Sequence, residues 1–283
     1  GEECMLSNKS VLPVITVDQE KCNHCLACIS ACPVKYCNDA SGEYVAINPD
    51  LCIGCGECLK ACTQGARRGL DDTERFFHDL KRGVQMVAIV APAVASNFPN
   101  QYLNLNGFLK RAGIKAVFDV SFGAELTIKT YLDHIQKTNA KCVIAQPCPA
   151  IVSYIETYKP NLLKYLAPAD SPMLHAAKMI KSYFPQYANH KIAVISPCYA
   201  KKREFIDTGF GDYNVTMAAL DNYFKENRIN LAGYPQAEYD NPPAERAVLF
   251  STPGGLRDTA ERWMPGVSKK IRKIEGPHTI YHY

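Results

Sequence analysis

Residues 22–33 read CNHCLACISACP, and residues 52–62 repeat the same cysteine spacing as CIGCGECLKAC. In each run three cysteines stand three positions apart, and a fourth follows four positions later. The chain of 283 residues has 13 cysteines, and its first ten residues, GEECMLSNKS, show no apolar stretch typical of a secretory signal. Without an export signal, so many cysteines indicate metal ligation or thiol chemistry rather than disulfide bonds.

Both spacings match the cysteine run of bacterial two-cluster ferredoxins, in which the fourth cysteine ligates the other cluster. Three closely spaced thiolates can wrap three corners of one cubane, while the fourth cysteine enters a helix that leads to the neighbouring cluster. Alternating residues at 11–18 and 43–50 predict a short strand before each run. The sequence predicts two [4Fe-4S] clusters, held by Cys22, Cys25, Cys28 and Cys62 (cluster one) and by Cys52, Cys55, Cys58 and Cys32 (cluster two).

Two zinc sites are the alternative, because paired CxxC motifs also bind zinc. Two tandem runs of four cysteines are far more specific for iron–sulfur clusters. Cys4 and Cys37 lie outside both runs; Cys4 has no assigned role, and we expect Cys37 to be a bystander and not a ligand. Gly54 and Gly56 flank Cys55, where missing side chains would let the backbone approach a cluster. Because so short a module has no obvious substrate pocket, it is predicted to relay electrons and to perform no net chemistry alone.

The chain divides into two parts of opposite charge. Residues 1–70 have six Lys or Arg against eight Asp or Glu, a net charge of −2, and the rest has 26 against 20, a net charge of +6. We expect a ferredoxin domain at 1–70, a linker helix at 71–85 and a body at 86–283. The overall charge of +4 is too mild and too evenly spread to indicate a nucleic-acid partner, and no apolar run is long enough for a membrane span.

The body alternates short apolar runs with amphipathic segments. Helical patterns cover residues 71–83, 126–138 and 153–166. The expected strands are MVAIVAPA (86–93), KAVFDVS (115–121), KCVIAQPC (141–148), KIAVISPC (191–198) and AVLFST (247–252). The predicted fold is an α+β ferredoxin-like module followed by an α/β, two-lobed body with largely parallel sheets.

Three of the expected strands end at a proline, which cannot donate a hydrogen bond to a β-ladder. The three endings are Ala91-Pro92, Pro147-Cys148 and Pro197-Cys198. Ligands of open parallel sheets bind beyond the carboxyl ends of the strands. We therefore expect Cys148 and Cys198 to face one crevice.

Other residues around these strand ends can be interpreted as functional or as merely structural. Lys201 lies one turn beyond Cys198 and either binds an anionic ligand or belongs to a solvated lysine pair with Lys202. Cys142, at the start of its expected strand, is predicted to be a small buried residue. The glycine turn within residues 250–256 allows close approach of a cofactor, but alone it is weak evidence.

These motifs resemble those of the iron-only ([FeFe]) hydrogenases, in a divergent, sensory-like or low-activity form, with a ferredoxin module before the large-subunit body. The family's first active-site motif reads Thr-Ser-Cys-Cys-Pro-x-Trp, and residues 146–150 stand in its place. The second reads Met-Pro-Cys-x-x-Lys-Lys, and residues 196–202 match it. The resemblance implies that Cys148 and Cys198 ligate the [4Fe-4S] part of the active-site H-cluster and that Lys201 holds a cyanide of its di-iron unit. By the same resemblance, the di-iron pocket is lined by Ala91, Pro92, Pro172 and Phe250.

The chain departs from the family at several positions. Pro147 replaces the cysteine that relays protons, Ser196 replaces methionine, and residues 129–131 replace the relay acids. No cysteine follows Cys198, so the third motif with its two further H-cluster cysteines is missing. The ending GPHTIYHY looks like a helix begun at Thr279 and cut short, which predicts that the chain stops before that motif. Alone, it is expected to lack a complete H-cluster.

The leading hypothesis is an iron–sulfur oxidoreductase that interconverts H₂ and protons, or senses H₂, at an H-cluster fed by the two ferredoxin clusters. The alternative is a hydrogenase-like iron–sulfur protein without a di-iron site, acting in electron transfer or cluster assembly. A third hypothesis is a ferredoxin fused to a purely structural body. The expected partner is a small electron-transfer protein, and iron–sulfur chemistry without an export signal indicates a cytoplasmic, anaerobic setting.

Overall fold

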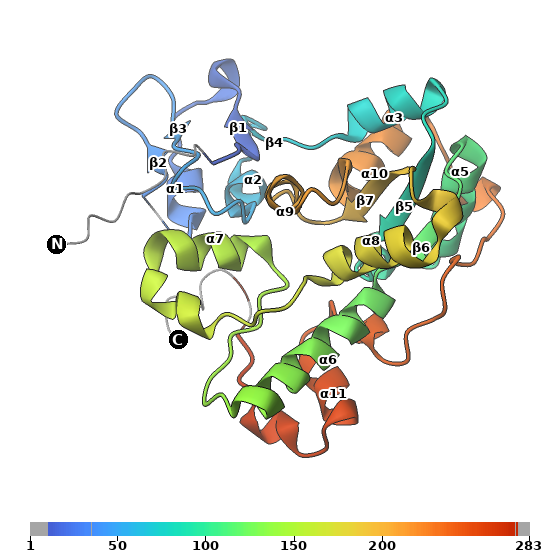
Figure 1. The fold of residues 1–283 in the computed structure, drawn as a ribbon. Helices are drawn as coiled ribbons and strands as arrows, with labels where there is room; N and C mark the ends of the chain where they lie inside the picture. Colours follow the sequence, from blue (N-terminus) through green and yellow to red (C-terminus); the bar gives the residue numbers. More distant parts are fainter. Residues whose placement is uncertain (1–10, 35, 275, 277–283) are drawn as a thin grey trace.

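The computed structural model describes residues 11–34, 36–274 and 276. They form a small cysteine-rich module beside a larger α/β body (Figure 1). The helix expected from Thr279 lies outside the described residues. None of the described helices is both long enough and apolar enough to cross a membrane.

The module consists of two antiparallel strand pairs and two short helices that pack together. Strand β1 pairs with β4, and β2 pairs with β3. The strands expected at 11–18 and 43–50 form over shorter ranges within those limits. The elements are β1 (Ile15–Val17), the 3-10 helix η1 (Gln19–Lys21), α1 (Ala27–Ala31), β2 (Asn38–Asp39), β3 (Ala46–Ile47), α2 (Glu57–Ala61) and β4 (Arg67–Gly69).

The turn before each module helix has the same backbone shape in both cysteine runs. His24 and Leu26 of the first run have φ values of 60° and 63°, and Gly54 and Gly56 of the second have 73° and 85°. Glycine adopts this left-handed region freely, whereas residues with a Cβ atom adopt it at a cost. The first run therefore keeps a strained shape that the second run reaches without strain, which is typical of a backbone shaped around a bound group.

The body is centred on a four-stranded parallel sheet in the order β6-β5-β7-β8. All five residues of β5 are fully buried, so helices cover both faces of the sheet, as parallel strands require. The strands expected at 86–93, 115–121 and 191–198 are confirmed. The strands are β5 (Met86–Val90), β6 (Val117–Asp119), β7 (Lys191–Ser196) and β8 (Tyr213–Thr216).

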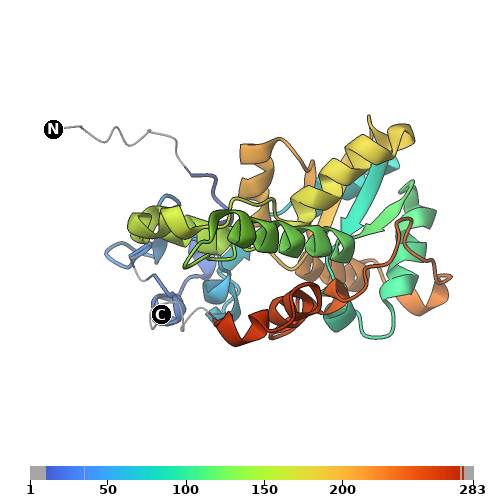
Figure 2. The ribbon, with the colours of Figure 1, turned by 60° about the horizontal axis from the view of Figure 1, so that its bottom comes forward.

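Helices surround the sheet of the body (Figures 1 and 2). Aromatic contacts join these helices to one another and to the sheet. Phe77 stacks on Tyr223 with ring centroids 3.7 Å apart, which joins α3 to α10, and Phe118 of β6 meets Phe184 at the end of α8 with centroids 5.0 Å apart. The helix α6 packs along α8. The helices of the body are α3 (Thr73–Lys81), α4 (Val94–Asn97), α5 (Tyr102–Ala112), α6 (Ser121–Thr138), α7 (Pro149–Tyr158), α8 (Pro172–Tyr183), α9 (Lys201–Thr208), α10 (Met217–Glu226) and α11 (Gly255–Trp263). Its 3-10 helices are η2 (Pro160–Tyr165), η3 (Pro185–Tyr187), η4 (Leu231–Gly233), η5 (Ala247–Leu249) and η6 (Val267–Lys270).

The expected strand at 141–148 is wrong. Only Ile144 makes a β-bridge there, to Leu166, and Cys148 is the N-cap of α7 instead of a strand end. Prolines on both sides of Cys148 remove two ladder donors, and Pro149 suits the first turn of a helix. Cys142 is exposed, so the prediction of a small buried residue there is also wrong.

The expected strand at 247–252 is wrong as well, because Ala247–Leu249 forms the 3-10 turn η5. Glu125 of α6 explains this turn. Its buried Oε1 atom accepts hydrogen bonds from the backbone N–H groups of Arg246 and Ala247 at 2.7 and 2.9 Å. A strand would direct those two N–H groups to opposite sides, where one carboxylate oxygen could not accept both.

Two further differences from the expected elements concern α7 and β8. The helix expected at 71–83 is confirmed as α3, but that expected at 153–166 breaks at Tyr158, because the residue before Pro160 disfavours helical backbone. The strand β8 was not expected, since its sequence YNVT is half polar. Asn214 and Thr216 are nonetheless fully buried, and the carboxylates of residues 71 and 72 accept hydrogen bonds from both.

Glu125 also accepts a hydrogen bond from Nε1 of Trp263, the single tryptophan of the chain, at 3.0 Å. Burial alone would raise the pKa of Glu125, but the hydrogen bonds from Arg246, Trp263 and Ala247 outweigh burial and hold the pKa below its usual range. The group is therefore a carboxylate at neutral pH. We expect Glu125→Gln to lower the free energy of unfolding by about 1–3 kcal/mol at pH 7, because one amide oxygen cannot serve all three donors.

The measurement is urea unfolding followed by fluorescence of Trp263, whose emission should also shift in the folded variant. Glu245→Gln is the control, because Glu245 pairs with Arg262 at the surface, where ion pairs contribute little. Equal unfolding free energies for the native protein and Glu125→Gln would contradict the assigned role.

Candidate functional site

The first hollow of the module gathers cysteines from both runs. Its lining includes all four predicted ligands of cluster one, and it encloses about 310 Å³ that opens to solvent. Cys25 is exposed, whereas Cys28 lies buried on α1. The four thiols are those of Cys22, Cys25, Cys28 and Cys62. Folding thus places the last cysteine of the second run beside the first three of the first run.

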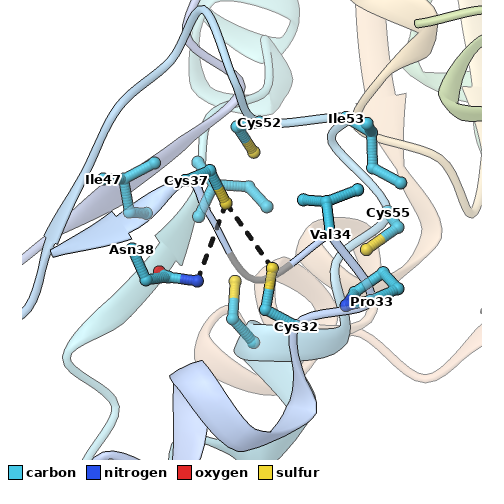
Figure 3. A pocket seen from close by; sticks show the side chains of 11 residues that line it. Cys32, Pro33, Val34, Cys37, Asn38, Ile47, Cys52, Ile53 and Cys55 are labelled. Carbon is cyan, nitrogen blue, oxygen red and sulfur yellow. Dashed lines mark hydrogen bonds between the residues drawn. The ribbon is translucent and has the colours of Figure 1, made fainter. Parts of the chain in front are cut away.

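The second hollow, also about 310 Å³, is lined by the complementary set (Figure 3). Its cysteines include the four predicted ligands of cluster two, Cys52, Cys55, Cys58 and Cys32. Burial raises the pKa of Cys55 to about 11 and that of Cys58 to about 12. Buried thiolates need a positive countercharge, which iron bound in the hollow would supply.

Cys37, expected to be a bystander, lines this second hollow as a fifth cysteine. It is buried, its Sγ lies 3.5 Å from Sγ of Cys32, and Nδ2 of Asn38 donates to it at 3.6 Å (Figure 3). Hydrogen bonds with Cys32 and Cys52, together with burial, raise the pKa of Cys37 far above its usual range. The hydrogen bond between Cys37 and Cys52 has the opposite effect on Cys52 and lowers its pKa to about 6. Cys37 is thus a buried thiol in contact with a predicted cluster ligand.

Arg67 lines the first hollow and is a residue that sequence reasoning missed. Its side chain is buried, and Nη2 donates to Sγ of Cys28 and to the Val45 carbonyl, both at 3.0 Å. Its Nη1 is buried with no hydrogen-bond partner in the described structure. The sequence feature that could have indicated this residue is a cation five positions after Cys62, at the start of strand β4, which pairs with β1.

Lys201 connects the two Pro-Cys turns of the body. Its Nζ donates to the Pro147 carbonyl, just before Cys148, at 3.2 Å and pairs with Glu204 at 2.7 Å. Lys201 is buried, so the solvated lysine pair is wrong for it. Burial, followed by the nearby charge of Cys148, raises the pKa of Cys198 to about 11. The hydrogen bond from Lys201 to the Pro147 carbonyl brings the Cys148 turn to the Cys198 turn, although only Cys198 follows a strand of the sheet.

Asn214 of β8 fixes the second Pro-Cys turn. Its Nδ2 donates to the carbonyls of Cys198 and Tyr199 at 3.1 and 3.3 Å, and the Cys198 N–H donates to Oγ of Ser196 at 3.2 Å. These hydrogen bonds hold the loop in place from both sides.

The four expected pocket residues occupy three different settings. Ala91 is buried at the end of β5, where its N–H donates to the Ile195 carbonyl of β7 at 2.9 Å, and Pro92 follows it. Pro172 begins α8, and its carbonyl lies against Gly123. Phe250 follows η5 and packs in an apolar cluster with Ile128 and Leu132 of α6. Ala91 and the Cys198 turn share one edge of the sheet, and the lining of a di-iron pocket by all four stays a prediction.

The loop that carries the second cysteine run packs against the body. Arg203 of α9 donates from Nε to the Leu12 carbonyl at 3.1 Å and from Nη1 to the Cys52 carbonyl at 2.7 Å. The Tyr158 hydroxyl at the end of α7 donates to the Leu51 carbonyl at 2.7 Å. Both α7 and α9 directly follow a Pro-Cys turn.

Apolar contacts reinforce this junction. Cys32, Val34, Cys37 and Ile53 form one buried cluster with Tyr154 and Ile155 of α7. A Cβ atom on Gly54 would lie 3.1 Å from Cβ of Ala200, which immediately precedes α9. The second hollow is therefore the one seated on the body.

The residues present fit two iron–sulfur clusters and only part of a third. Each module hollow has four thiols from both runs, and the unpartnered Nη1 of Arg67 is a spare donor at the first. Among the described residues, no group of three or more His, Cys, Asp or Glu side chains is placed to hold a single metal ion. At Cys148 and Cys198 the chain brings two thiols, whereas a cubane takes four.

Comparisons with known proteins identify both parts of the chain. A family described as a 4Fe-4S dicluster domain matches residues 14–63, which favours iron–sulfur clusters over zinc in the module. The family described as "Iron only hydrogenase large subunit, C-terminal domain" matches residues 84–277.

Relatives and solved structures give the same result. The NADP-reducing hydrogenase subunit HndD of Solidesulfovibrio fructosivorans is 27% identical over 93% of this chain and 53% of its own length. The nuclear prelamin A recognition factor of Rattus norvegicus is 26% identical over 56% of this chain and 41% of its own length. An apo variant of the [FeFe]-hydrogenase HydA1 from Chlamydomonas reinhardtii matches with a TM-score of 0.56 and 29% identity, over 68% of this chain and 57% of that one.

The chain spans about half the length of the curated relatives that it matches. The family match covers well over half of the chain itself. From the fold, the cysteine sites and these matches together, the chain belongs to the family of iron-only hydrogenase large subunits, with a 4Fe-4S dicluster module at its N-terminal end.

Proposed function

We propose that this chain is the electron-relay part of an iron-only-hydrogenase-type oxidoreductase. Cluster one would be held by the four thiols of the first hollow, and cluster two by the four of the second. Each bound [4Fe-4S] cluster would take up and give back one electron at a time. The chain's own part is to hold the thiolates, bury them and fix the second hollow against the two Pro-Cys turns.

The observation that carries this proposal is the junction between module and body. The backbone beside Cys52 accepts a hydrogen bond from Arg203, and Ile53 packs against α7. The helices involved begin next to Cys148 and Cys198. A module that only bound metal for stability would not require its second hollow to sit on the two helices that start at the remaining paired cysteines.

The second hollow packs against the body, whereas part of the first hollow faces solvent. Cys25 is exposed, and the neighbouring Leu26 side chain is 45% exposed. This face suits a small electron-transfer protein, which would exchange electrons at cluster one. Electrons would then pass between the outer hollow, the inner hollow and the site at Cys148 and Cys198.

The reaction proposed for the complete site is the reversible conversion of H₂ into two protons and two electrons. Hydrogenases among the relatives support it. A cubane at the Pro-Cys pair would take two further thiolates beyond Cys148 and Cys198. Pro147 stands where the resembling enzymes have a proton-relaying cysteine and has no proton to transfer, so slow turnover is proposed.

A second candidate is a hydrogenase-like iron–sulfur protein without a di-iron unit, acting in electron transfer or cluster assembly. The contacts of Lys201 favour it, because its ammonium is already engaged by the Pro147 carbonyl and by Glu204. Similarity also extends to the prelamin A recognition factor, whose name describes no hydrogenase.

Infrared spectroscopy separates the two candidates when the protein is purified anaerobically together with whatever segment or partner supplies the two further thiolates. Bands of bound CO and CN⁻, together with H₂ evolution from reduced methyl viologen, would support the hydrogenase reaction. Reduced-cluster EPR signals without those bands or H₂ would support the second candidate. Absence of any iron–sulfur signal after reconstitution would overturn both.

The ligand assignment predicts how much iron the chain binds. Reconstituted protein should hold about eight iron atoms in the module, and Cys25→Ala should lose about four of them together with one reduced-cluster EPR signal. Cys142→Ala is the control, because Cys142 is an exposed cysteine outside both hollows and should leave the iron content unchanged. Equal iron loss in the two variants would refute the pairing.

The junction predicts a second effect. Arg203→Met removes the donors to the Leu12 and Cys52 carbonyls, and breaking these charged hydrogen bonds should cost about 2–4 kcal/mol. Hydrogen–deuterium exchange should become faster in residues 50–56 and 200–206. Lys202→Met is the matched control, since Lys202 pairs with Asp72 of the body at 2.9 Å and should leave residues 50–56 protected. Unchanged exchange in Arg203→Met would show that the junction does not depend on this residue.

A further inference from the structure

Arg67 is the one strongly basic side chain in the lining of the first hollow. The residue is 6% exposed, and Nη2 contacts Sγ of Cys28 and the Val45 carbonyl, both at 3.0 Å. It occupies the first position of β4, opposite Val17 of β1. The strand pairing therefore holds the guanidinium beside the sulfur of a predicted cluster ligand.

A buried guanidinium requires a counter-charge, because removing an unpaired charge from water is costly. Within the ranges that the structure describes, no carboxylate forms an ion pair with Arg67. Its Nη1 also has no hydrogen-bond partner there. The protein residues around Arg67 thus leave both its charge and one of its donors uncompensated.

A cubane with four thiolate ligands would supply the missing negative charge. Such a cluster is an anion when oxidised and gains one more negative charge when it takes up an electron. Hydrogen bonds to the sulfurs and nearby positive charge stabilise the reduced form more than the oxidised form, because the reduced form has the greater negative charge.

We propose that Arg67 is a positioning residue of cluster one that sets its reduction potential, by donating a hydrogen bond to the Cys28 thiolate and supplying a fixed buried positive charge. The effect is to raise the potential of cluster one and ease its reduction by the electron partner. This inference rests on the proposed function, since it requires cluster one to be present.

Arg68 provides a matched control on the same strand. Successive residues of a strand point to opposite faces, and the Arg68 side chain is 55% exposed, where Nη2 pairs with Asp18 at 2.5 Å. Substituting either arginine removes one positive charge from β4. Only the substitution at Arg67 removes it from beside a cysteine.

The experiment is an EPR-monitored titration of the anaerobically reconstituted full chain with dithionite as the reductant. Arg67→Met should leave the iron content at the native level and make one reduced-cluster signal appear at a more negative potential. The affected signal should be the one lost in Cys25→Ala. Arg67→Lys should restore part of the shift, because it keeps the charge without the planar fork, and Arg68→Met should move neither signal.

Native iron content with unchanged potentials in Arg67→Met would overturn the proposal. If that variant fails to assemble cluster one, Arg67→Gln, which keeps a donor but not the charge, takes its place with the same expected shift. Loss of the cluster in both neutral variants but not in Arg67→Lys would support the charge requirement, and loss in all three would refute it. Failure of the proposed function looks different, because the native chain itself would then lack the two clusters.

Discussion

The hydrogen bond from Arg203 to the Cys52 carbonyl belongs to the junction between module and body, on which the proposed functional arrangement depends. It joins a helix that begins beside Cys198 to the loop that begins the second cysteine run. Without this junction, the cysteines of the module would not be held against those of the body. With it, the second hollow, α7 and α9 form one continuous packed region, and the predicted metal sites follow one another in space.

The sequence was sufficient for the local features and insufficient for the non-local ones. The two cysteine runs could be assigned because cluster ligands must follow a fixed local spacing, and β5 and β7 could be recognised because parallel strands buried on both faces are continuously apolar. Cys37 and Arg67 could not, since β-pairing brings them to the hollows from outside the runs. For Arg67 the sequence holds only a weak signal, a cation five positions after Cys62.

Buried polar networks explain two further errors. Strand β8 was missed because Asn214 and Thr216 look like surface residues, yet aspartates just before α3 accept their hydrogen bonds in the interior. Residues 247–252 looked like a strand because they are apolar, but Glu125, more than 120 positions earlier, holds them in a turn. In both cases a distant carboxylate outweighed the local pattern.

The two cysteine runs are similar, but they differ at the position of Gly54. Two similar cysteine runs could in principle present either loop to the body, with the order of the two hollows reversed. At the position equivalent to Gly54, however, the first run has His24, whose ring reaches to the Gly42 carbonyl at 2.9 Å. A side chain at Gly54 would press on Val14 and Ala200. The missing Cβ atom at Gly54 therefore distinguishes the second loop from the first and breaks the pseudo-symmetry of the module where it packs on the body.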